Sequence, residues 1–240
     1  DHPSIFVFDP RGKYIRSFGN EFQGGGHGLE VRREPDGEFL YVTGYQHLKN
    51  FAKYDLHGEQ VWMQRAPMES GIYAEGEHEA TTGRWGRDRF MPTNFAFLPD
   101  GGFMLADGYG TFTIHRYDAN GKWMSMFGAP GKGDGQFNLP HGLWLDDRQQ
   151  DPLVVVADRV NGRLQWFDLD GAHKKTLDGF ILPANCDVHG DVLLVPDLSA
   201  RVTLLDKENQ PLAQLGEDSE WRKAVLKDGM ALRTRPDDWQ

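Results

Sequence analysis

The chain has one cysteine, a deficit of basic residues and no long apolar run. The single cysteine, Cys186, excludes an internal disulfide and removes the usual evidence about redox compartment. No stretch of about 18 apolar residues is present to span a bilayer. Lys and Arg number 26 against 36 Asp and Glu, for a net charge of -10, which disfavours binding to nucleic-acid phosphates. We therefore expect a soluble chain with neither nucleic acid nor membrane as partner.

A secretion signal is not visible either, because the opening DHPSIFVFDP lacks a charged segment followed by an apolar one. The sequence leaves the compartment and the oligomeric state open, with a secreted or periplasmic location favoured. Glycine and proline, by contrast, are plentiful and spread along the chain, at 29 and 13 of 240 residues. Such frequent punctuation predicts many short strands joined by turns, and hence an all-β fold.

A repeated turn organises the chain. A hydrophobic strand end followed by Asp recurs five times, in FVFDPRG, AKYDLHG, HRYDANG, QWFDLDG and TLLDKEN. The aspartates of these copies are Asp9, Asp55, Asp118, Asp168 and Asp206, with spacings of 46, 63, 50 and 38 residues. A four-stranded propeller blade takes roughly 40 to 50 residues. The longest spacing indicates a long insertion.

The repeat predicts an all-β, six-bladed β-propeller of which about five blades are represented in this chain. Four blades are near-complete, and the first copy supplies the outer strands of another. We expect residues 1–216 to form a single propeller domain. Residues 217–240 read as a polar linker, with a short helix around Trp221 to Lys227, leading toward a further blade that is not in the chain.

The residues that enter each blade alternate in type. In a propeller the innermost strand of each blade begins beside the central channel, so equivalent entries face one another. The four entries are His27, Thr93, His141 and Ala184. In a six-fold ring, alternate entries form a triangle, and catalytic zinc commonly takes three protein ligands. The pattern predicts a three-histidine zinc site whose third ligand lies beyond Gln240.

The remaining histidines fit that pattern less well. Four of them lie near turns and are expected to be solvated: His57, His115, His173 and His189. His47 and His78 lie on loops that could reach the channel, and both are kept as spare ligands. A structural reading of His27 and His141, as histidines satisfied by backbone carbonyls, also stays open.

Two further side chains are candidates for chemistry at the channel mouth. Tyr109 lies between two glycines in DGYGTFT, in a loop that opens on the same end as the entries. Beside a metal it could act as a general base, because a nearby cation lowers the pKa of a phenol. Arg159 follows the Asp at the corresponding place of the next blade, where it could clamp a carboxylate.

At these residues the sequence resembles the catalytic core of peptidyl-α-hydroxyglycine α-amidating lyase, a six-bladed propeller of the NHL-repeat class. The matching stretches run in blade order between about Phe6 and Gly216: GHGLEV, PTNFAF, MLADGYG, LPHGLWL and VVADRVNGR. The resemblance implies that His27 and His141 are two of three zinc ligands, that Tyr109 is the base and that Arg159 contacts substrate. It also implies that the Leu29 carbonyl belongs to a structural calcium site.

The implied reaction cleaves the carbon–nitrogen bond of a carbinolamide in a small polar or peptide-derived substrate, releasing an amide and an aldehyde acid such as glyoxylate. Two other functions stay open. One is a non-enzymatic NHL propeller that serves as a protein- or ligand-binding module. The other is a lactonase-like metal hydrolase, for which Asn94 and Asn185, each one step after an entry, are the relevant residues.

Overall fold

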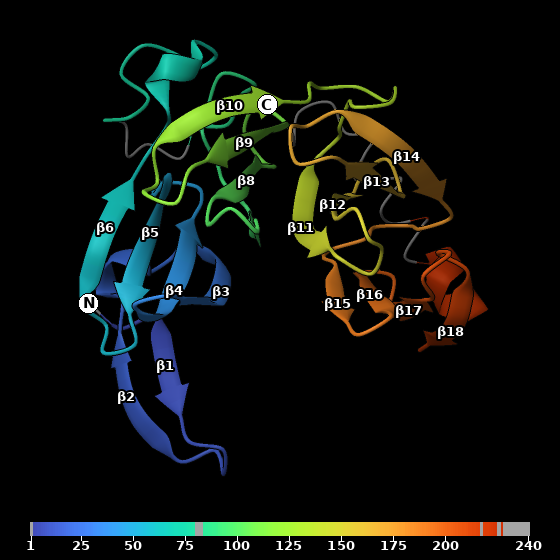
Figure 1. Cartoon of the computed structure of the whole chain (residues 1–240), viewed down its shortest axis with the longest axis horizontal. Coiled ribbons are helices and arrows are strands. Elements are labelled where there is room, and N and C mark those ends of the chain that lie inside the picture. The colour runs from blue at the N-terminus through green and yellow to red at the C-terminus, as the bar shows by residue number, and fades with distance from the viewer. Residues whose placement is uncertain (1, 80–83, 217, 225–226, 228–240) are drawn as a thin grey trace.

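The computed structural model of this chain describes residues 2–79, 84–216, 218–224 and 227. These residues form four antiparallel sheets of four strands each and one antiparallel pair of strands (Figure 1). The all-β propeller predicted from the repeats is confirmed, with four complete blades and the outer strands of another. Within the described residues, no helix is both long and apolar enough to cross a membrane.

The strands follow the chain order from sheet to sheet. The two-stranded sheet holds β1 (Ile5–Phe8) and β2 (Tyr14–Phe18). The first complete blade holds β3 (Gly26–Glu34), β4 (Gly37–Gly44), β5 (Asn50–Asp55) and β6 (Gln60–Gln64). The second holds β7 (Phe95–Phe97), β8 (Phe103–Asp107), β9 (Thr113–Tyr117) and β10 (Trp123–Phe127). The third holds β11 (Pro140–Asp146), β12 (Leu153–Asp158), β13 (Arg163–Phe167) and β14 (His173–Asp178), and the fourth β15 (Asp187–His189), β16 (Val192–Asp197), β17 (Arg201–Leu205) and β18 (Pro211–Leu215).

The repeated aspartates close the hairpin between the two outer strands of each blade. In the second blade, Asp118 Oδ1 accepts the backbone N–H groups of Asn120 and Lys122, each at 2.8 Å. Such a side chain satisfies backbone donors that the turn leaves without strand partners. Asp9 makes the same pair of bonds between β1 and β2. This shared turn identifies β1 and β2 as the outer strands of a blade.

The core lies between neighbouring sheets, and the middle strands of each blade are buried on both faces. In β12, Val154 and Val156 pack toward the preceding blade, whereas Val155 and Ala157 pack toward the following one. Because successive side chains of a strand point to opposite faces, an uninterrupted apolar run suits a strand with a sheet on either side. The run LVVVA is therefore explained by the stacking of blades around the channel.

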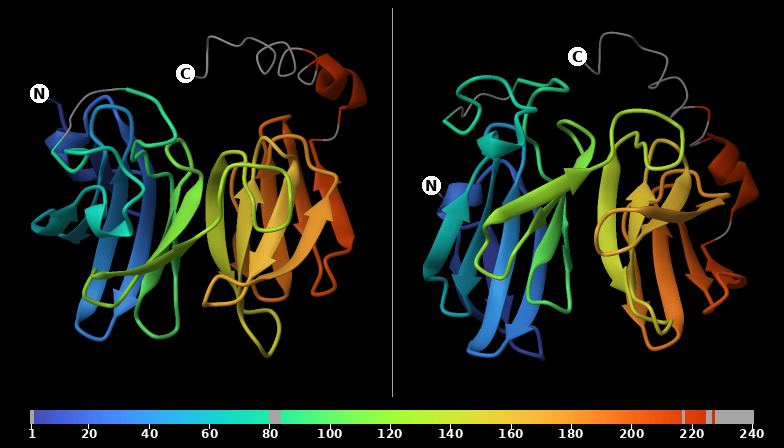
Figure 2. Two further views of the ribbon diagram at one scale, coloured as in Figure 1. Left: turned by 90° about the horizontal axis from the view of Figure 1, so that it is seen from above. Right: turned by 45° about the horizontal axis from the view of Figure 1, so that its top comes forward.

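The innermost strands of the four blades, β3, β7, β11 and β15, contact one another in succession. Figure 2 shows the sheets standing side by side in chain order, so the N-terminal ends of these strands gather near one end of the channel. Residues 219–224 after the last blade are helical. Most of the expected linker, residues 217, 225–226 and 228–240, lies outside the described residues.

The long insertion occupies residues 65–94, between β6 and β7, and contains the 3₁₀ helix η2 (Met68–Ser70); a second, η1 (Asn20–Phe22), precedes β3. A fully buried ion pair ties the insertion to the loop after β4: Lys49 Nζ donates to Glu77 Oε1 at 2.7 Å. Arg89 Nη1 donates to the other oxygen of Glu77 at 3.0 Å. The insertion is thereby held against the end of the first blade.

Candidate functional site

Both entry histidines lie where the pairing of an innermost strand is irregular. The register of β3 with β4 shifts between Gly26 and Leu29, so His27 falls within the shift. The register of β11 with β12 shifts between Pro140 and Leu143, which places His141 in the equivalent position. Such irregularities redirect a side chain out of the regular alternation. Here they turn two equivalent imidazoles toward each other.

The glycine after each histidine permits the next blade to approach. A Cβ on Gly142 would lie 2.4 Å from the Asn185 Cα, and one on Gly28 would lie 2.4 Å from the carbonyl oxygen of Thr93. Real Cβ contacts are never that short. The His-Gly pairs of the sequence therefore combine a functional side chain with a packing requirement.

The other two entries orient the histidines through their backbone. His27 Nδ1 donates to the carbonyl oxygen of Thr93 at 3.0 Å, and His141 Nδ1 donates to that of Ala184 at 2.8 Å. A carbonyl oxygen only accepts, so the hydrogen of each neutral ring is on Nδ1 and Nε2 is bare. A histidine that ligates a metal is usually oriented by such a bond from its other nitrogen.

The two bare nitrogens point at one another and at the Tyr109 hydroxyl. His27 Nε2 lies 3.1 Å from His141 Nε2. The hydroxyl oxygen of Tyr109 is 3.0 Å from the nitrogen of His141 and 3.3 Å from that of His27. One hydroxyl hydrogen can serve only one of the two nitrogens. The lone pair of the other nitrogen then has no hydrogen to accept and faces a second lone pair. A bound cation would relieve the repulsion between them.

Burial keeps both rings neutral at pH 7. It lowers the pKa of His27, against the raising effect of the Thr93 carbonyl, and the charge of Arg159 lowers it further. For His141, burial, Arg159 and the neighbouring His27 lower the pKa to about 2. Neutral imidazole is the form that ligates metals.

Tyr109 is held by the loop between β8 and β9. The buried carboxylate of Asp107, two residues earlier, accepts the backbone N–H groups of Met91 at 2.6 Å and Thr111 at 2.9 Å, and the Tyr73 hydroxyl at 3.0 Å. These bonds tie the loop to the insertion. Burial raises the pKa of Tyr109, and the adjacent positive charge of Arg159 opposes that rise.

Arg159 lies on the equivalent loop of the next blade, between β12 and β13. Its Nη1 donates to the Tyr109 hydroxyl at 3.4 Å, and its Nε is buried with no hydrogen-bond partner among the described residues. Burial lowers the pKa of this guanidinium, while Tyr109 raises it, yet an arginine stays protonated in proteins. A buried cation with free donors is suited to an anionic group such as a carboxylate.

A cavity of about 370 Å³ borders both histidines. Leu29 and three polar side chains, Glu30, Asn94 and Asn185, also line it. Asn94 Nδ2 donates to Glu30 Oε1 at 3.2 Å and to Asn185 Oδ1 at 3.4 Å, whereas Asn94 Oδ1 is buried without a partner within the described chain. Burial raises the pKa of Glu30, the Asn94 bond opposes this, and Asp187 adds to it.

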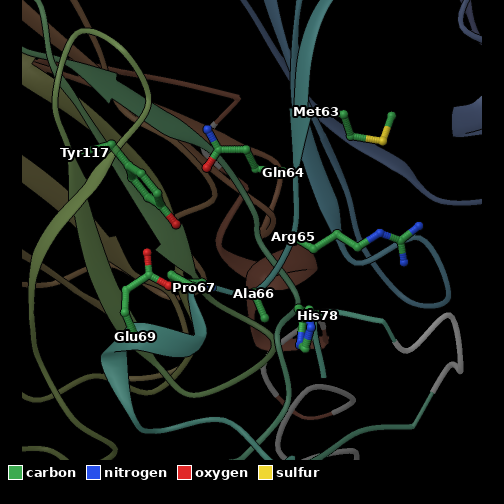
Figure 3. Close-up of a pocket in the computed structure, with 8 residues that line it drawn as sticks. All are labelled: Met63, Gln64, Arg65, Ala66, Pro67, Glu69, His78 and Tyr117. Carbon is green, nitrogen blue, oxygen red and sulfur yellow. The ribbon is translucent and has the colours of Figure 1, made fainter. Parts of the chain in front are cut away.

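The spare histidines do not join the site. His47 is exposed, and His78 is exposed beside Glu79. His78 lines a different cavity, of about 420 Å³, with Arg65, Glu69 and Tyr117 (Figure 3). Across the described residues, no group of three or more His, Cys, Asp and Glu side chains could hold a metal ion. The third histidine expected beyond Gln240 is outside this sequence.

One expectation about the other histidines is wrong. His115 is completely buried rather than solvated, because its position on β9 faces the core between the first two blades. Its tautomer is defined, since the indole N–H of Trp123 can only donate, here to His115 Nδ1 at 3.2 Å. The hydrogen on Nε2 then goes to the Tyr73 oxygen at 2.6 Å. His57 and His189 are exposed as expected, and His173 is half-buried.

Sequence reasoning missed two aromatic residues at the site. Tyr45 follows β4, and its ring centroid is 5.1 Å from that of His27 and 5.2 Å from that of Tyr109. Trp85, from the insertion, packs edge-on against Tyr109 at 5.6 Å. Neither belongs to the repeat pattern, so only the position of their loops brings them here.

The sequence is similar to those of several curated proteins. A probable peptidyl-α-hydroxyglycine α-amidating lyase of Caenorhabditis elegans is 36% identical over 170 residues, which cover 70% of this chain and 43% of that protein. The chain is homologous to amidating lyases and NHL-repeat proteins. NHL repeat-containing protein 3 of Mus musculus is 27% identical over 175 residues, covering 70% of this chain and 46% of that protein. No family model matches the chain.

The alignments span 16% to 43% of the length of the curated amidating relatives and 46% of NHL repeat-containing protein 3, so this chain matches less than half of each. Among solved structures, virginiamycin B lyase from Staphylococcus aureus matches with a TM-score of 0.60 and 11% sequence identity. The match covers 90% of this chain and 64% of that protein. At that identity the likeness concerns the propeller fold alone.

Proposed function

We propose that this chain carries the site of a zinc-dependent lyase that cleaves the carbon–nitrogen bond of a carbinolamide-type substrate. The observation that carries the proposal is the convergence of His27 Nε2, His141 Nε2 and the Tyr109 hydroxyl within 3.3 Å of one another. Homology to amidating lyases supports a lyase-like propeller. The zinc ion and the carbinolamide substrate are what we propose beyond that homology.

His27 and His141 would hold the zinc, because both present bare, neutral nitrogens that are oriented through Nδ1. Two nitrogens that each lie about 2.0–2.1 Å from a zinc ion are at most about 4 Å apart. The observed 3.1 Å satisfies that limit. At least one more ligand is needed, and the proposal assigns it to the histidine expected beyond Gln240. When bound, the ion would supply a Lewis acid that lowers the pKa of neighbouring hydroxyl groups.

Tyr109 and Arg159 would act on the substrate itself. Tyr109, as the deprotonated phenol, takes the proton of the substrate hydroxyl as general base. The electron pair of the broken O–H bond forms the aldehyde C=O, the carbon–nitrogen bond breaks, and Tyr109 returns the proton to the departing amide nitrogen. Arg159 holds the carboxylate of the substrate through its free donors and keeps a positive charge beside the phenol oxygen. Its charge favours the deprotonated phenol, the form that Tyr109 needs before it can accept the proton.

A structural calcium ion is a second proposed component. Hard cations of this kind prefer carboxylate, amide and carbonyl oxygens. Leu29, whose carbonyl is the proposed ligand, lines the cavity that also holds Glu30 and Asn94. The buried, unpartnered oxygen of Asn94 fits such an ion.

The test is elemental analysis together with product release on purified full-length protein. We expect stoichiometric zinc in the wild type, its loss in His27→Ala plus His141→Ala, and its retention in the control His57→Ala, which alters an exposed turn histidine. Tyr109→Phe should keep the metal and release glyoxylate from a peptidyl-α-hydroxyglycine at least a hundredfold more slowly, within the range for general bases. Unchanged metal content in the double variant would overturn the zinc site.

The lactonase-like hydrolase is the second candidate, favoured by the hydrogen-bonded cluster of Glu30, Asn94 and Asn185. A lactonase should hydrolyse simple lactones, and Asn94→Ala should abolish that activity while glyoxylate release is absent throughout. A wild type without metal and without either activity supports the third candidate, a non-enzymatic binding module.

A further inference from the structure

We propose that the site selects substrates with an aromatic or large planar apolar acyl group beside the reacting glycine unit. The selecting surface is an aromatic wall formed by Tyr45, Trp85 and Tyr109. This inference rests on the proposed function for its substrate backbone and adds the identity of the neighbouring group.

The three rings of the aromatic wall form a continuous chain of contacts beside the histidines. Trp85 meets Tyr109 edge-on at 5.6 Å between centroids, and Tyr109 meets Tyr45 at 5.2 Å. Tyr45 and Tyr109 each contact the ring of His27, at 5.1 and 5.3 Å. A group bound near the two imidazoles therefore meets an extended aromatic surface.

None of these rings contributes to the core. The four hydrophobic clusters of the described residues, including the half-buried side chains packed on them, contain none of Tyr45, Trp85 and Tyr109. Tyr45 and Trp85 are both half-buried and so keep part of their surface accessible. Two large rings that lie outside these clusters and pack on His27 and Tyr109 are typical of a ligand surface.

A single buried network holds the two loops that carry this wall. Lys49, four residues after Tyr45, pairs with Glu77 with both side chains fully buried. Arg89, four residues after Trp85, pairs with the same carboxylate at 3.0 Å. Glu77 also accepts the backbone N–H of Phe90 at 2.9 Å. The rings are thus pre-positioned, and binding need not order them.

Charge and shape together define the ligand. Arg159 contacts Tyr109 on one side and has a buried, unpartnered Nε, so it takes a carboxylate. The aromatic wall includes the same tyrosine, Tyr109, and presents ring edges and faces to a bound ligand. A planar ring in contact with such a wall binds about two- to tenfold more tightly than its area burial alone would give. An N-aroylglycine skeleton meets both requirements.

The experiment compares N-benzoylglycine with N-acetylglycine, which share the carboxylate and differ only in the acyl group. Calorimetric titration of the full-length protein should give about tenfold tighter binding of the benzoyl compound. In Trp85→Ala this ratio should fall to threefold or less. The matched control Trp221→Ala, which removes an exposed tryptophan of the C-terminal helix, should keep the wild-type ratio.

The α-hydroxy forms of both compounds separate this inference from the lyase proposal. A preference for benzoyl that is lost in Trp85→Ala, without glyoxylate release from either compound, would keep the wall and overturn the lyase. Glyoxylate release with equal kcat/KM for the two compounds in the wild type would keep the lyase and overturn the wall. An equal ratio in wild type and Trp85→Ala also overturns it, and circular dichroism checks that the variant is folded.

Discussion

At the residue scale, the position of one hydrogen atom decides what each buried histidine can do. His27 and His141 donate from Nδ1 to backbone carbonyls, which leaves Nε2 bare and available. His115 has the opposite tautomer, because Trp123 occupies its Nδ1. Its Nε2 hydrogen is used by Tyr73, whose own hydroxyl bonds Asp107 at 3.0 Å. The first two rings can therefore ligate, whereas the third only holds the loop of Tyr109.

His115 makes the fold sensitive to acid. Burial lowers its pKa from 6.5 to about 3, so below pH 6.5 the unfolded chain binds a proton that the folded chain does not. Stability from this group is present above pH 6.5 and is lost as the pH falls toward 3, by about 2 kcal/mol between pH 6.5 and 5. Urea unfolding should show this loss, and His115→Gln should show a shallower slope over the same range. Tyr73, Thr113 and Trp123 contact the ring nitrogens of His115, and the rings of Phe90 and Tyr117 pack against it. Equal slopes would contradict the assignment.

At the element scale, an irregular strand start and a glycine act together. The shift in β11 aims His141 at the channel, and Gly142 lets the segment before β15 pass directly beneath it. The same pair of devices occurs at His27 and Gly28 in β3. Each of these two blade entries therefore has two roles. Its glycine lets the next blade pack closely, and its irregular pairing orients the histidine.

Gly142→Ala should destabilise the protein by about 1–3 kcal/mol, the usual effect of overpacking a filled interior. The new Cβ would lie 2.1 Å from Asn185 Oδ1 and 2.4 Å from its Cα, so the neighbouring backbone would have to move. Urea unfolding measures the change. Gly26→Ala is the matched control, because its nearest contact would be 3.5 Å from Phe22, and it should alter stability by no more than about 0.5 kcal/mol. Similar losses in both variants would argue against the packing explanation.

At the scale of the whole molecule, the insertion is joined to the first blade by a charge pair that no solvent reaches. Lys49 and Glu77 are fully buried, and the pair spans residues far apart in the chain. A buried pair of this kind contributes little relative to apolar residues, but an unpaired remnant is costly. The main effect of the Lys49–Glu77 pair is to fix two loops relative to each other, because it joins the loop of Tyr45 to the insertion that carries Trp85.

Glu77→Gln should lower the free energy of unfolding by about 3–5 kcal/mol, since it leaves the ammonium of Lys49 buried without its counter-ion. The exposed pair of Arg33 and Glu38, with side chains 83% and 41% exposed, is the comparison. Glu38→Gln should cost less than about 1 kcal/mol. Denaturant unfolding of the two variants side by side measures the difference, and equal small losses would show that the insertion is not anchored by this pair.

The propeller could be predicted because its signals are local. The aspartates at hairpin turns, such as Asp118, bond backbone groups two and four residues away, so their pattern is written within each repeat. The uninterrupted apolar run of a middle strand is likewise a local signal, because successive side chains of a strand point to opposite faces of the sheet. His27 and His141 were found as candidates because equivalent repeat positions face the same channel. The buried state of His115 was missed, since a turn-proximal residue on a strand can face either core or solvent.

The sequence by itself determined the all-β blades, their order and the alternation of histidine with other residues at the blade entries, because these depend on periods and turns within about 50 residues. Only the tertiary structure decided that two imidazole nitrogens lie 3.1 Å apart with the Tyr109 hydroxyl within 3.3 Å of both, and that Tyr45 packs on His27 and Trp85 on Tyr109. Such contacts join residues up to 114 positions apart. They depend on how blades close around an axis and on a buried ion pair between loops, and no local pattern encodes either.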